Sequence, residues 1–307
     1  AIAAAVGTGA AIRPASAQAL RVRVGYIGDF HGASMTAIAN RLDLWKKYNL
    51  AADIKGFTNG PIQIQALGTG DLDFGYIGPG ALWLPITGKA KLVAINVVGF
   101  SDRVVGQPAI KSIQDLKGKT VAVPEGTSGD MLLRLALAKA GMKLDDVRRL
   151  TMDPSTVVTA FASGQVDGAA LWYPHIATMR SRIPNLNELF SNQDALPQNS
   201  FPSSFIMRNE LDTPASAPLV DAFIRVLKEA NDYRQKNVPQ VVEWTAAMLN
   251  APKANLEAEA QLAKYYSSQE LAQLSENGTV GSWLTGMNEM FKSFGRVPET
   301  VDPKTYS

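Results

Sequence analysis

Short apolar segments alternate with amphipathic stretches along the first half of the chain. Residues 20–28 alternate Val22 and Val24 with polar or small neighbours, and this period of two predicts a β-strand. Residues 51–57 predict a second strand, and apolar positions recur at helical spacing between the two strands. The next helix is expected to begin at Pro61, because proline is tolerated in a first helical turn. This alternation predicts βαβ units around a parallel sheet.

The same alternation starts again in the middle of the chain. Residues 120–123 predict a strand, and the loop 126–130 leads into a helix. The octet at 66–73 resembles the octet at 160–167, since in each a helix ends at a glycine and the chain enters a strand. Their separation is too long for a solenoid repeat, so we expect two similarly built α/β lobes. Beyond residue 217 the pattern becomes mostly helical.

Composition and charge exclude several classes of protein. Of 307 residues, 46% are apolar and 19% are charged, which is typical of a globular protein. The formal net charge is only +2, with acidic and basic residues interspersed, so no nucleic-acid partner is expected. Cysteine is absent, so we expect the fold to rest on its core without disulfides.

The N-terminal residues indicate export. Residues 1–12 are small and apolar, and Ala17 and Ala19 stand at the −3 and −1 positions of a cut before Leu20. We therefore expect residues 1–19 to be the remnant of a signal peptide, cleaved near Ala19/Leu20, and the mature protein to be periplasmic. A flexible alanine-rich tail would have a similar composition.

Several segments carry a family resemblance through their order along the chain, although none is specific alone. They are Val24-Gly25-Tyr26, 57–79 with its Gly-Asp-Leu-Asp-Phe-Gly core, 115–124, 164–174 and 206–208. Together they resemble the periplasmic substrate-binding proteins of the nitrate, sulfonate and taurine ABC importers, and taurine-binding proteins above all.

The resemblance implies a type II periplasmic binding protein fold, in which two α/β lobes enclose a ligand cleft and close around the ligand. Lobe one would combine 20–103 with 200–307, including the C-terminal helices, and lobe two would be 104–199. The crossovers would lie near 99–104 and 199–204. The resemblance also implies a monomeric receptor that binds a small molecule and docks on an ABC permease and ATPase complex, without cofactor, metal or catalytic residues.

Ligands of open parallel sheets bind at the carboxyl ends of the strands, where loops lead into helices. Helix N-termini at these positions favour anions. This rule selects the loops 28–31, 58–60, 78–80 and 126–130, and the resemblance adds 172–173 and 203–205. The expected ligand-binding residues are Asp29, Phe30, His31, Asn59, Gly78, Pro79, Thr127, Ser128, Gly129, Asp130, Asp153, Trp172 and Ser203.

The sequence leaves the identity of the ligand open. Hydroxyls and backbone N–H groups at 127–129 suit a sulfonate, although Thr127 or Ser128 serves equally well as a helix cap. The chain departs from taurine-binding proteins at Pro79-Gly80, where they are serine-rich. It departs again at Ser203, where they carry an aspartate for the ammonium group. Both departures weaken the case for taurine itself.

Acidic residues in the same region favour a different class of ligand. Carboxylates form strong hydrogen bonds with amines, amidines and guanidines, so a cationic or guanidine-like nitrogen compound is the alternative to a sulfonate. The residues concerned are Asp29, Glu125, Asp130 and Asp153.

Two other functions are possible on the same fold. A periplasmic sensor module would show the same sequence features. The neighbours Asp29 and His31 also suggest a catalytic pair, but the chain has no Gly-x-Ser-x-Gly elbow and its only other histidine is His175. Related proteins that make the thiamine pyrimidine carry a cysteine-rich motif, which this chain lacks. We therefore expect a binding protein and not an enzyme.

Overall fold

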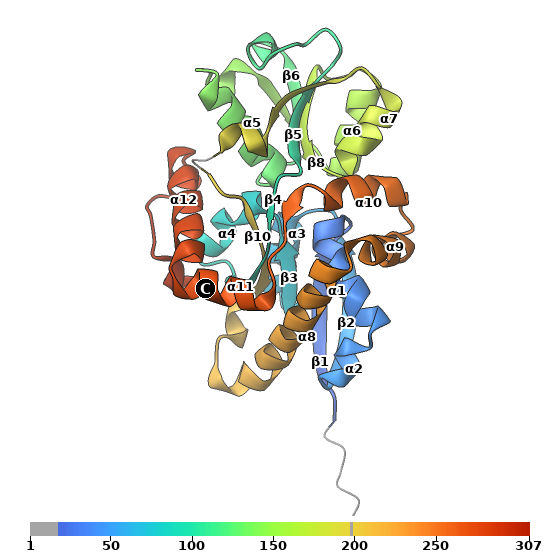
Figure 1. Cartoon of the computed structure of the whole chain (residues 1–307). Helices are drawn as coiled ribbons and strands as arrows, with labels where there is room; N and C mark the ends of the chain where they lie inside the picture. The colour runs from blue at the N-terminus through green and yellow to red at the C-terminus, as the bar shows by residue number, and fades with distance from the viewer. Residues whose placement is uncertain (1–17, 197–198) are drawn as a thin grey trace, which may run out of the picture.

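The computed structural model describes residues 18–196 and 199–307, which form two β-sheets covered by helices (Figure 1). The larger sheet has six strands in the order β11-β4-β10-β3-β1-β2, and the smaller has five in the order β7-β6-β8-β5-β9. We call the six-stranded sheet with its helices lobe one, and the five-stranded sheet with its helices lobe two. The expected α/β fold with two lobes is confirmed. Residues 1–17, which hold most of the expected signal peptide, lie outside the described residues.

Lobe one has a parallel core and antiparallel strands on one side. The strand β1 (Leu20–Ile27) pairs in parallel with β2 (Leu50–Phe57) and β3 (Phe74–Ile77). Strand β10 (Pro202–Met207) is antiparallel to β3 and to β4 (Lys91–Gly99), and β11 (Ala263–Lys264) pairs with β4. All four residues of β3 are buried, as expected for a central strand in a sheet that helices cover on both faces.

Lobe two repeats this plan with fewer strands. The strand β6 (Thr120–Val123) is parallel to β7 (Arg148–Thr151) and to β8 (Gly168–Trp172). Strand β5 (Asp102–Gly106) is antiparallel to β8 and to β9 (Asn187–Ser191). Its helices are α5 (Ser128–Lys139), α6 (Pro154–Ala162) and α7 (His175–Arg182), with the 3-10 turns η2 (Gln114–Leu116), η3 (Leu144–Asp146) and η4 (Asn192–Ala195).

After strand β10, the rest of the chain belongs to lobe one and is mostly helical, as the sequence predicts. The helices of lobe one pack around the sheet and reach up to lobe two, where α10 lies beside α7 (Figure 1). The helices are α1 (Phe30–Arg41), α2 (Leu44–Lys47), α3 (Gly60–Gly68), α4 (Trp83–Ile86), α8 (Ala217–Lys236), α9 (Val238–Leu249), α10 (Lys253–Ala260), α11 (Ser268–Glu276) and α12 (Thr279–Ser293), with the turns η1 (Pro79–Ala81), η5 (Asn209–Leu211), η6 (Pro214–Ser216) and η7 (Pro303–Thr305).

The chain passes between the lobes twice. The first passage joins β4 to β5, and the second runs from η4 to β10. Because β5 begins at Asp102 and belongs to the five-stranded sheet, lobe two as we define it begins before the expected boundary at 103/104. The exact lobe boundaries stay predictions. No helix in the described ranges is both long and apolar enough to cross a membrane.

A buried glutamine fixes the central strand of lobe one against a helix. The Gln63 amide donates to the carbonyl of Tyr76 at 2.8 Å, and its oxygen accepts from the Tyr76 N–H at 3.0 Å. Gln63 has no exposed surface, so both of its polar atoms are satisfied by this strand. The contact holds Tyr76 at the carboxyl end of β3, where its side chain faces the site.

Candidate ligand-binding site

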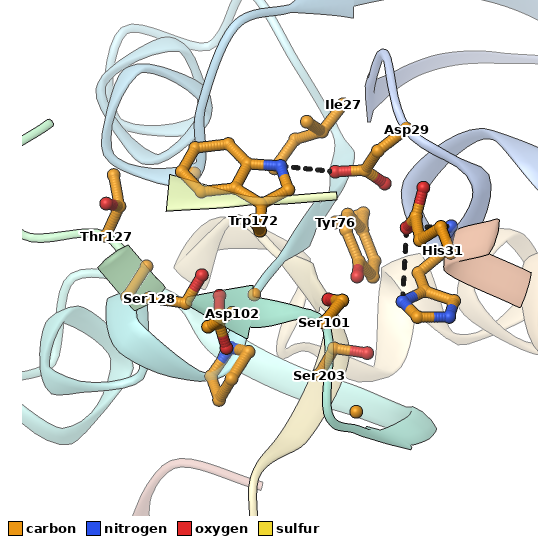
Figure 2. A pocket seen from close by; sticks show the side chains of 16 residues that line it. Ile27, Asp29, His31, Tyr76, Ser101, Asp102, Thr127, Ser128, Trp172 and Ser203 are labelled. Atoms are coloured by element: carbon orange, nitrogen blue, oxygen red, sulfur yellow. Dashed lines mark hydrogen bonds and ion pairs between the residues drawn. The ribbon is translucent and has the colours of Figure 1, made fainter. Parts of the chain in front are cut away.

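A small cavity lies where the carboxyl ends of the strands of both lobes meet (Figure 2). Its volume is about 40 Å³, which exceeds the ~10–15 Å³ that one water needs and suits a solute of a few non-hydrogen atoms. Both lobes contribute to its lining. The residues are Ile27, Asp29, His31, Gly60, Tyr76, Gly78, Pro79, Ala81, Gly99, Ser101, Asp102, Thr127, Ser128, Trp172, Ser203 and Glu259.

The first turn of α1 is saturated by two of these carboxyl groups. Asp29 is the N-cap and accepts from the Gly32 N–H through Oδ1 at 2.6 Å. Glu259, on α10, accepts from the N–H groups of Phe30 at 2.7 Å and His31 at 3.1 Å. The first N–H groups of a helix have no partner within the helix and lie at its positive end, so they attract anions. Here the chain's own carboxyl groups hold them.

A hydrogen bond between side chains joins the two lobes across the cavity. The indole Nε1 of Trp172, at the end of β8, donates to Oδ2 of Asp29 at 3.1 Å (Figure 2). Both residues are buried, with Trp172 6% exposed and Asp29 4% exposed. The two oxygens of Asp29 therefore serve different lobes, one as a helix cap in lobe one and one as the acceptor for lobe two.

Asp102 is the third carboxyl group of the cavity and enters from lobe two, at the start of β5. Asn192 holds it on one side: the Asn192 amide donates to Oδ2 at 2.9 Å and accepts from the Asp102 N–H at 2.8 Å. The other oxygen, Oδ1, is buried and has no hydrogen-bond partner among the described residues. An unpartnered buried carboxyl oxygen at a cavity wall is a position for a donor group.

Burial raises the pKa of all three carboxyl groups, because the charged form loses its hydration. The pKa of Asp29 rises to about 7, and donation from Gly32 and Trp172 limits the rise. Burial also raises the pKa of Glu259 well above its ordinary value, and its proximity to Asp29 adds to this rise. Burial raises the pKa of Asp102 as well, and donation from Ser128 and Asn192 limits the rise. The cavity thus holds carboxyl groups that are costly to ionise unless a positive charge is nearby.

His31 is neutral in this setting. Burial, followed by the charge of Arg234, lowers its pKa to about 3. Its Nδ1 lies 3.2 Å from Oε1 of Glu259 (Figure 2). Its Nε2 is buried without a partner among the described residues. The ring therefore helps to position Glu259.

No described residue that lines the cavity is a lysine or an arginine. Two arginines lie behind the wall and are bonded to other groups. Arg234 has no exposed surface and donates to Ser34 Oγ, Asn96 O and Asn231 Oδ1. Arg103 pairs with Glu188 at 3.0 Å and donates to backbone carbonyls. In addition, no three described His, Cys, Asp or Glu residues are grouped so that they could hold a metal ion.

The two lobes approach closely at the N-terminus of α5. A Cβ atom added at Gly80, in η1 of lobe one, would lie 2.2 Å from backbone atoms of Thr127 and Ser128 in lobe two. This distance is far below any normal contact, so only glycine permits the approach seen here. The Thr127 hydroxyl donates to Pro124 O at 2.7 Å and makes no cap bond. Ser128 lines the cavity.

The structure brings together eight of the residues expected at the site and places five elsewhere. The eight that line the cavity are Asp29, His31, Gly78, Pro79, Thr127, Ser128, Trp172 and Ser203. The other five, which have structural surroundings, are Phe30, Asn59, Gly129, Asp130 and Asp153.

Three of these five residues support the walls of the cavity. Phe30 is fully buried in the core, and only its N–H reaches Glu259. Asn59 caps α3 by accepting from the Ile62 N–H at 3.2 Å. Gly129 is required for packing inside lobe two, because a Cβ there would lie 2.4 Å from the Ala170 carbonyl oxygen.

Asp130 and Asp153 lie away from the cavity. Asp130 is surrounded by Arg134, Arg149 and Arg296, with its nearest contacts at 2.7 and 2.8 Å. Although burial alone would raise the pKa of Asp130, the arginines lower it. Asp153 is an exposed N-cap residue of α6. The carboxyl groups that line the cavity are therefore those of Asp29, Asp102 and Glu259, and not those of Asp130 and Asp153.

The polar residues that the sequence analysis did not select are Glu259, Asp102, Ser101 and Tyr76. Glu259 is separated from its partner Phe30 by 229 positions and lies in a helix whose pattern indicates only packing. Asp102 was placed near a crossover and was not considered as a wall. Its position inside the expected crossover 99–104 gives no local signal for a place on the cavity wall.

Comparisons with known proteins agree with this geometry. The family model described as NMT1/THI5 like matches residues 34–240. A binding protein of Brucella abortus (strain 2308) is 57% identical over 292 residues, which cover 95% of this chain and 91% of that protein. The taurine-binding periplasmic protein of Escherichia coli (strain K12) is 23% identical over 300 residues, which cover 93% of this chain and 90% of that protein.

Solved structures show the same fold. The alkanesulfonate-binding protein of Xanthomonas axonopodis pv. citri, bound to MOPS, superposes with a TM-score of 0.75 at 21% identity, covering 95% of this chain and 99% of that one. The periplasmic nitrate-binding protein of Synechocystis PCC 6803 has a TM-score of 0.75 at 14% identity, covering 94% and 85%. The resemblance inferred from the sequence is confirmed: the chain belongs to the NMT1/THI5-like family and has the fold of the periplasmic binding proteins.

Proposed function

We propose that this protein is the solute receptor of an ABC importer, and that it captures a small polar solute by closing its two lobes. The cavity between the lobes is the observation that carries this proposal, because residues of both lobes line it. Two relatives are named as binding proteins for taurine and for aliphatic sulfonates, and this supports a receptor role.

Polar contacts on several sides of the cavity support closure as the working motion. Beside the bond from Trp172 to Asp29, Arg296 of lobe one pairs with Asp130 and Glu125 of lobe two at 2.7 and 3.0 Å. On another side, the Asn255 amide donates to the Thr178 hydroxyl at 3.3 Å. The indole of Trp83 also donates to the Gly126 carbonyl of lobe two at 3.3 Å. All of these contacts would have to break when the lobes swing apart, as hinge motion requires.

The remaining parts of the proposal follow from this role. The receptor would work in the periplasm as a monomer after cleavage of residues 1–19, and would deliver its solute to a permease and ATPase complex. A receptor holds its solute unchanged, so we do not expect turnover. A sensor on the same fold would bind in the same way, and loss of uptake in cells that lack this chain separates the importer from the sensor.

The test of the receptor proposal uses protein purified from the periplasm. The protein is denatured, and the solute that it releases is identified and counted by mass spectrometry. About one molecule of unchanged solute per chain is expected. If no small molecule is released and none of a broad library of polar solutes raises the melting temperature, the receptor proposal fails.

A further inference from the structure

We propose that the solute is a small organic cation with several N–H donors, such as an ammonium, amidinium or guanidinium compound, and that Asp102 and Asp29 face it. This inference rests on the proposed receptor function and names the substrate class of the same cavity. It differs from the sulfonates, taurine and nitrate that relatives and structural neighbours are named for.

The first argument concerns the place where an anion would bind. A helix N-terminus is the ready site for a sulfonate or a nitrate, because its N–H groups point outward at the positive end of the dipole. At α1 that place is filled, since Glu259 accepts from Phe30 and His31 and Asp29 accepts from Gly32. Glu259 thus fills the anion position of α1, and at α5, whose first residue Ser128 also lines the cavity, the carboxyl group of Asp102 lies close to the Ser128 hydroxyl.

The second argument is the charge of the cavity wall. Three carboxyl groups line a space of about 40 Å³, and no lysine or arginine among the described residues lines it with them. Arg234 and Arg103 lie behind the wall and donate to Ser34, Asn231 and Glu188, while Nε of Arg234 has no partner among the described residues. A solute cation supplies the missing positive charge at the point where burial makes ionised carboxyl groups costly.

The third argument is the unpartnered oxygen of Asp102. Asp102 lines the same cavity, Asn192 satisfies its Oδ2, and its Oδ1 is buried with no hydrogen-bond partner among the described residues, although the Ser128 hydroxyl lies near enough to lower the pKa of the group. A planar N–H donor suits such an oxygen, and the aromatic rings of Trp172 and Tyr76 on other walls suit a cation as well (Figure 2). An organic cation fits better than a metal ion, because the described acidic and histidine residues do not form a metal-binding group.

Charges from both lobes also explain why the solute would drive closure. Asp29 and Glu259 belong to lobe one and Asp102 to lobe two. When the lobes close without a cation, these groups approach one another and must either take up protons or repel. A cation between them reverses the sign of the interaction, so it favours the closed form more than the open one.

The experiment is a titration of the whole chain with probes matched in shape and opposite in charge. Guanidinium and nitrate are both planar and trigonal and have the same number of non-hydrogen atoms. Acetamidinium and methylammonium extend the cation set, and ethanesulfonate extends the anion set. Binding is measured by calorimetry at constant ionic strength. At least one of the three cations is expected to bind, and neither anion.

Two substitutions test the assignment of residues. Asp102→Asn keeps the size of the side chain and removes its charge, and we expect it to weaken the cation by at least about tenfold, the effect of one hydrogen bond to a charged group. Asp29→Asn, which keeps a residue able to cap α1, should weaken it similarly. Asp153→Asn is the matched control at an exposed aspartate outside the cavity and should leave the affinity unchanged within about twofold.

The outcomes separate the two proposals. If nitrate or ethanesulfonate binds and no cation does, the inference is overturned while the receptor function stands. If none of the probes binds, the inference is also overturned, and the solute released from the periplasmic protein decides the receptor function by itself. A cation can also bind to the parent and equally well to both Asp102→Asn and Asp29→Asn. If circular dichroism shows that both variants are folded, this result means that the assignment to this cavity is wrong.

Discussion

The indole of Trp172 donates a hydrogen bond to Asp29 across the junction of the two lobes, at 3.1 Å and in a buried setting. Asp29 caps the helix that follows β1 in lobe one, whereas Trp172 ends β8 in lobe two. The same carboxyl group thus takes part in helix capping, in the wall of the cavity and in holding the lobes together. A change at either residue should alter closure.

Replacing Trp172 by phenylalanine should weaken solute binding by about three- to tenfold, because the closed form loses one buried hydrogen bond and leaves an acceptor of Asp29 unpaired. Calorimetry with the best-binding cation checks this. The control is Trp45→Phe, whose indole bonds to Asn40 far from the cavity. Equal losses in both variants would mean that the bond to Asp29 has no special part in closure.

The Gly80→Ala variant should fold normally and fail to close. A Cβ at this position would lie 2.2 Å from the backbone of Thr127 and Ser128, so the lobes are held apart while each stays intact. We expect affinity to fall by more than about tenfold, with the melting temperature of the free protein nearly unchanged. Gly28→Ala, where an added Cβ meets no atom within 4 Å, is the control. Normal affinity in Gly80→Ala would contradict the close approach.

Affinity for a cation should rise with pH up to about 7 and then level off. The pKa of Asp29 in the free cavity is raised to about 7 by burial, so below this pH a cation must displace a proton. The titratable groups that interact electrostatically with Asp29 are Asp102, Glu259 and Tyr76, and none of them is a cation. Well below pH 7 the dissociation constant should change by about tenfold per pH unit for one proton released.

The same shift sets how Asp29 affects the stability of the free protein. Because its pKa is raised above the ordinary value of 3.8, its contribution to stability is fully present below that pH and is lost as the pH rises through about 7. A bound cation restores this contribution to stability above pH 7, because it offsets the charge of the ionised Asp29. Calorimetry in buffers of different ionisation enthalpy counts the released protons. Affinity that does not change between pH 5.5 and 8 would show that Asp29 carries no proton to release.

Glu259→Ala should give the protein an affinity for anions that the parent lacks. The substitution frees the N–H groups of Phe30 and His31 at the start of α1. A helix N-terminus with free N–H groups binds anions, so nitrate or ethanesulfonate should now bind while the cation is weakened. Glu257→Ala, an exposed neighbour on the same helix, is the control. No gain of anion binding in folded Glu259→Ala would count against Glu259 as the group that fills the anion position of α1.

Asp130→Asn should destabilise the protein, and it also removes one of the ion pairs that join the two lobes. Asp130 is buried and bonded by Arg134, Arg149 and Arg296, so removing its charge leaves three arginines facing each other, at a cost of about 3 kcal/mol. Urea unfolding at pH 7 measures this cost. The pKa of Asp130 is lowered by these arginines, so in the parent protein its contribution is lost as the pH falls below its ordinary range. A variant as stable as the parent would refute this role.

The sequence predicts the fold well because strands, helices and turns are local signals. It predicts Asp29, His31 and Thr127 at the cavity for the same reason, since each follows the end of a strand in a parallel sheet, where ligands gather. The part of the cavity wall that depends on tertiary contacts is harder to predict from the sequence. Glu259 comes from a helix near the C-terminus, and no motif links it to α1.

Helix geometry explains the acidic residues that were expected at the cavity and lie elsewhere. Asp130 follows Ser128 by two positions in α5, a rotation of about 200°, so the two side chains point in nearly opposite directions. Asp153 follows β7, which is the edge strand of its sheet, and so it lies in solvent away from the centre of the cleft. Of the four acidic residues behind the expected acidic cleft, Asp29 alone is among the residues that line the cavity, and Asp102 and Glu259 are the other carboxyl groups there.

Closure around a cation is tested most directly by a distance measurement across the cleft. The chain has no cysteine, so Ser181→Cys on α7 and Ala254→Cys on α10 accept spin labels without a background. These helices lie beside each other in the closed form, and both positions are exposed. Pulsed electron resonance should show a longer, broader distance distribution in the free protein and a shorter, narrower one with saturating guanidinium, acetamidinium or methylammonium. A distance that no cation shortens, or that nitrate shortens equally, would contradict this account.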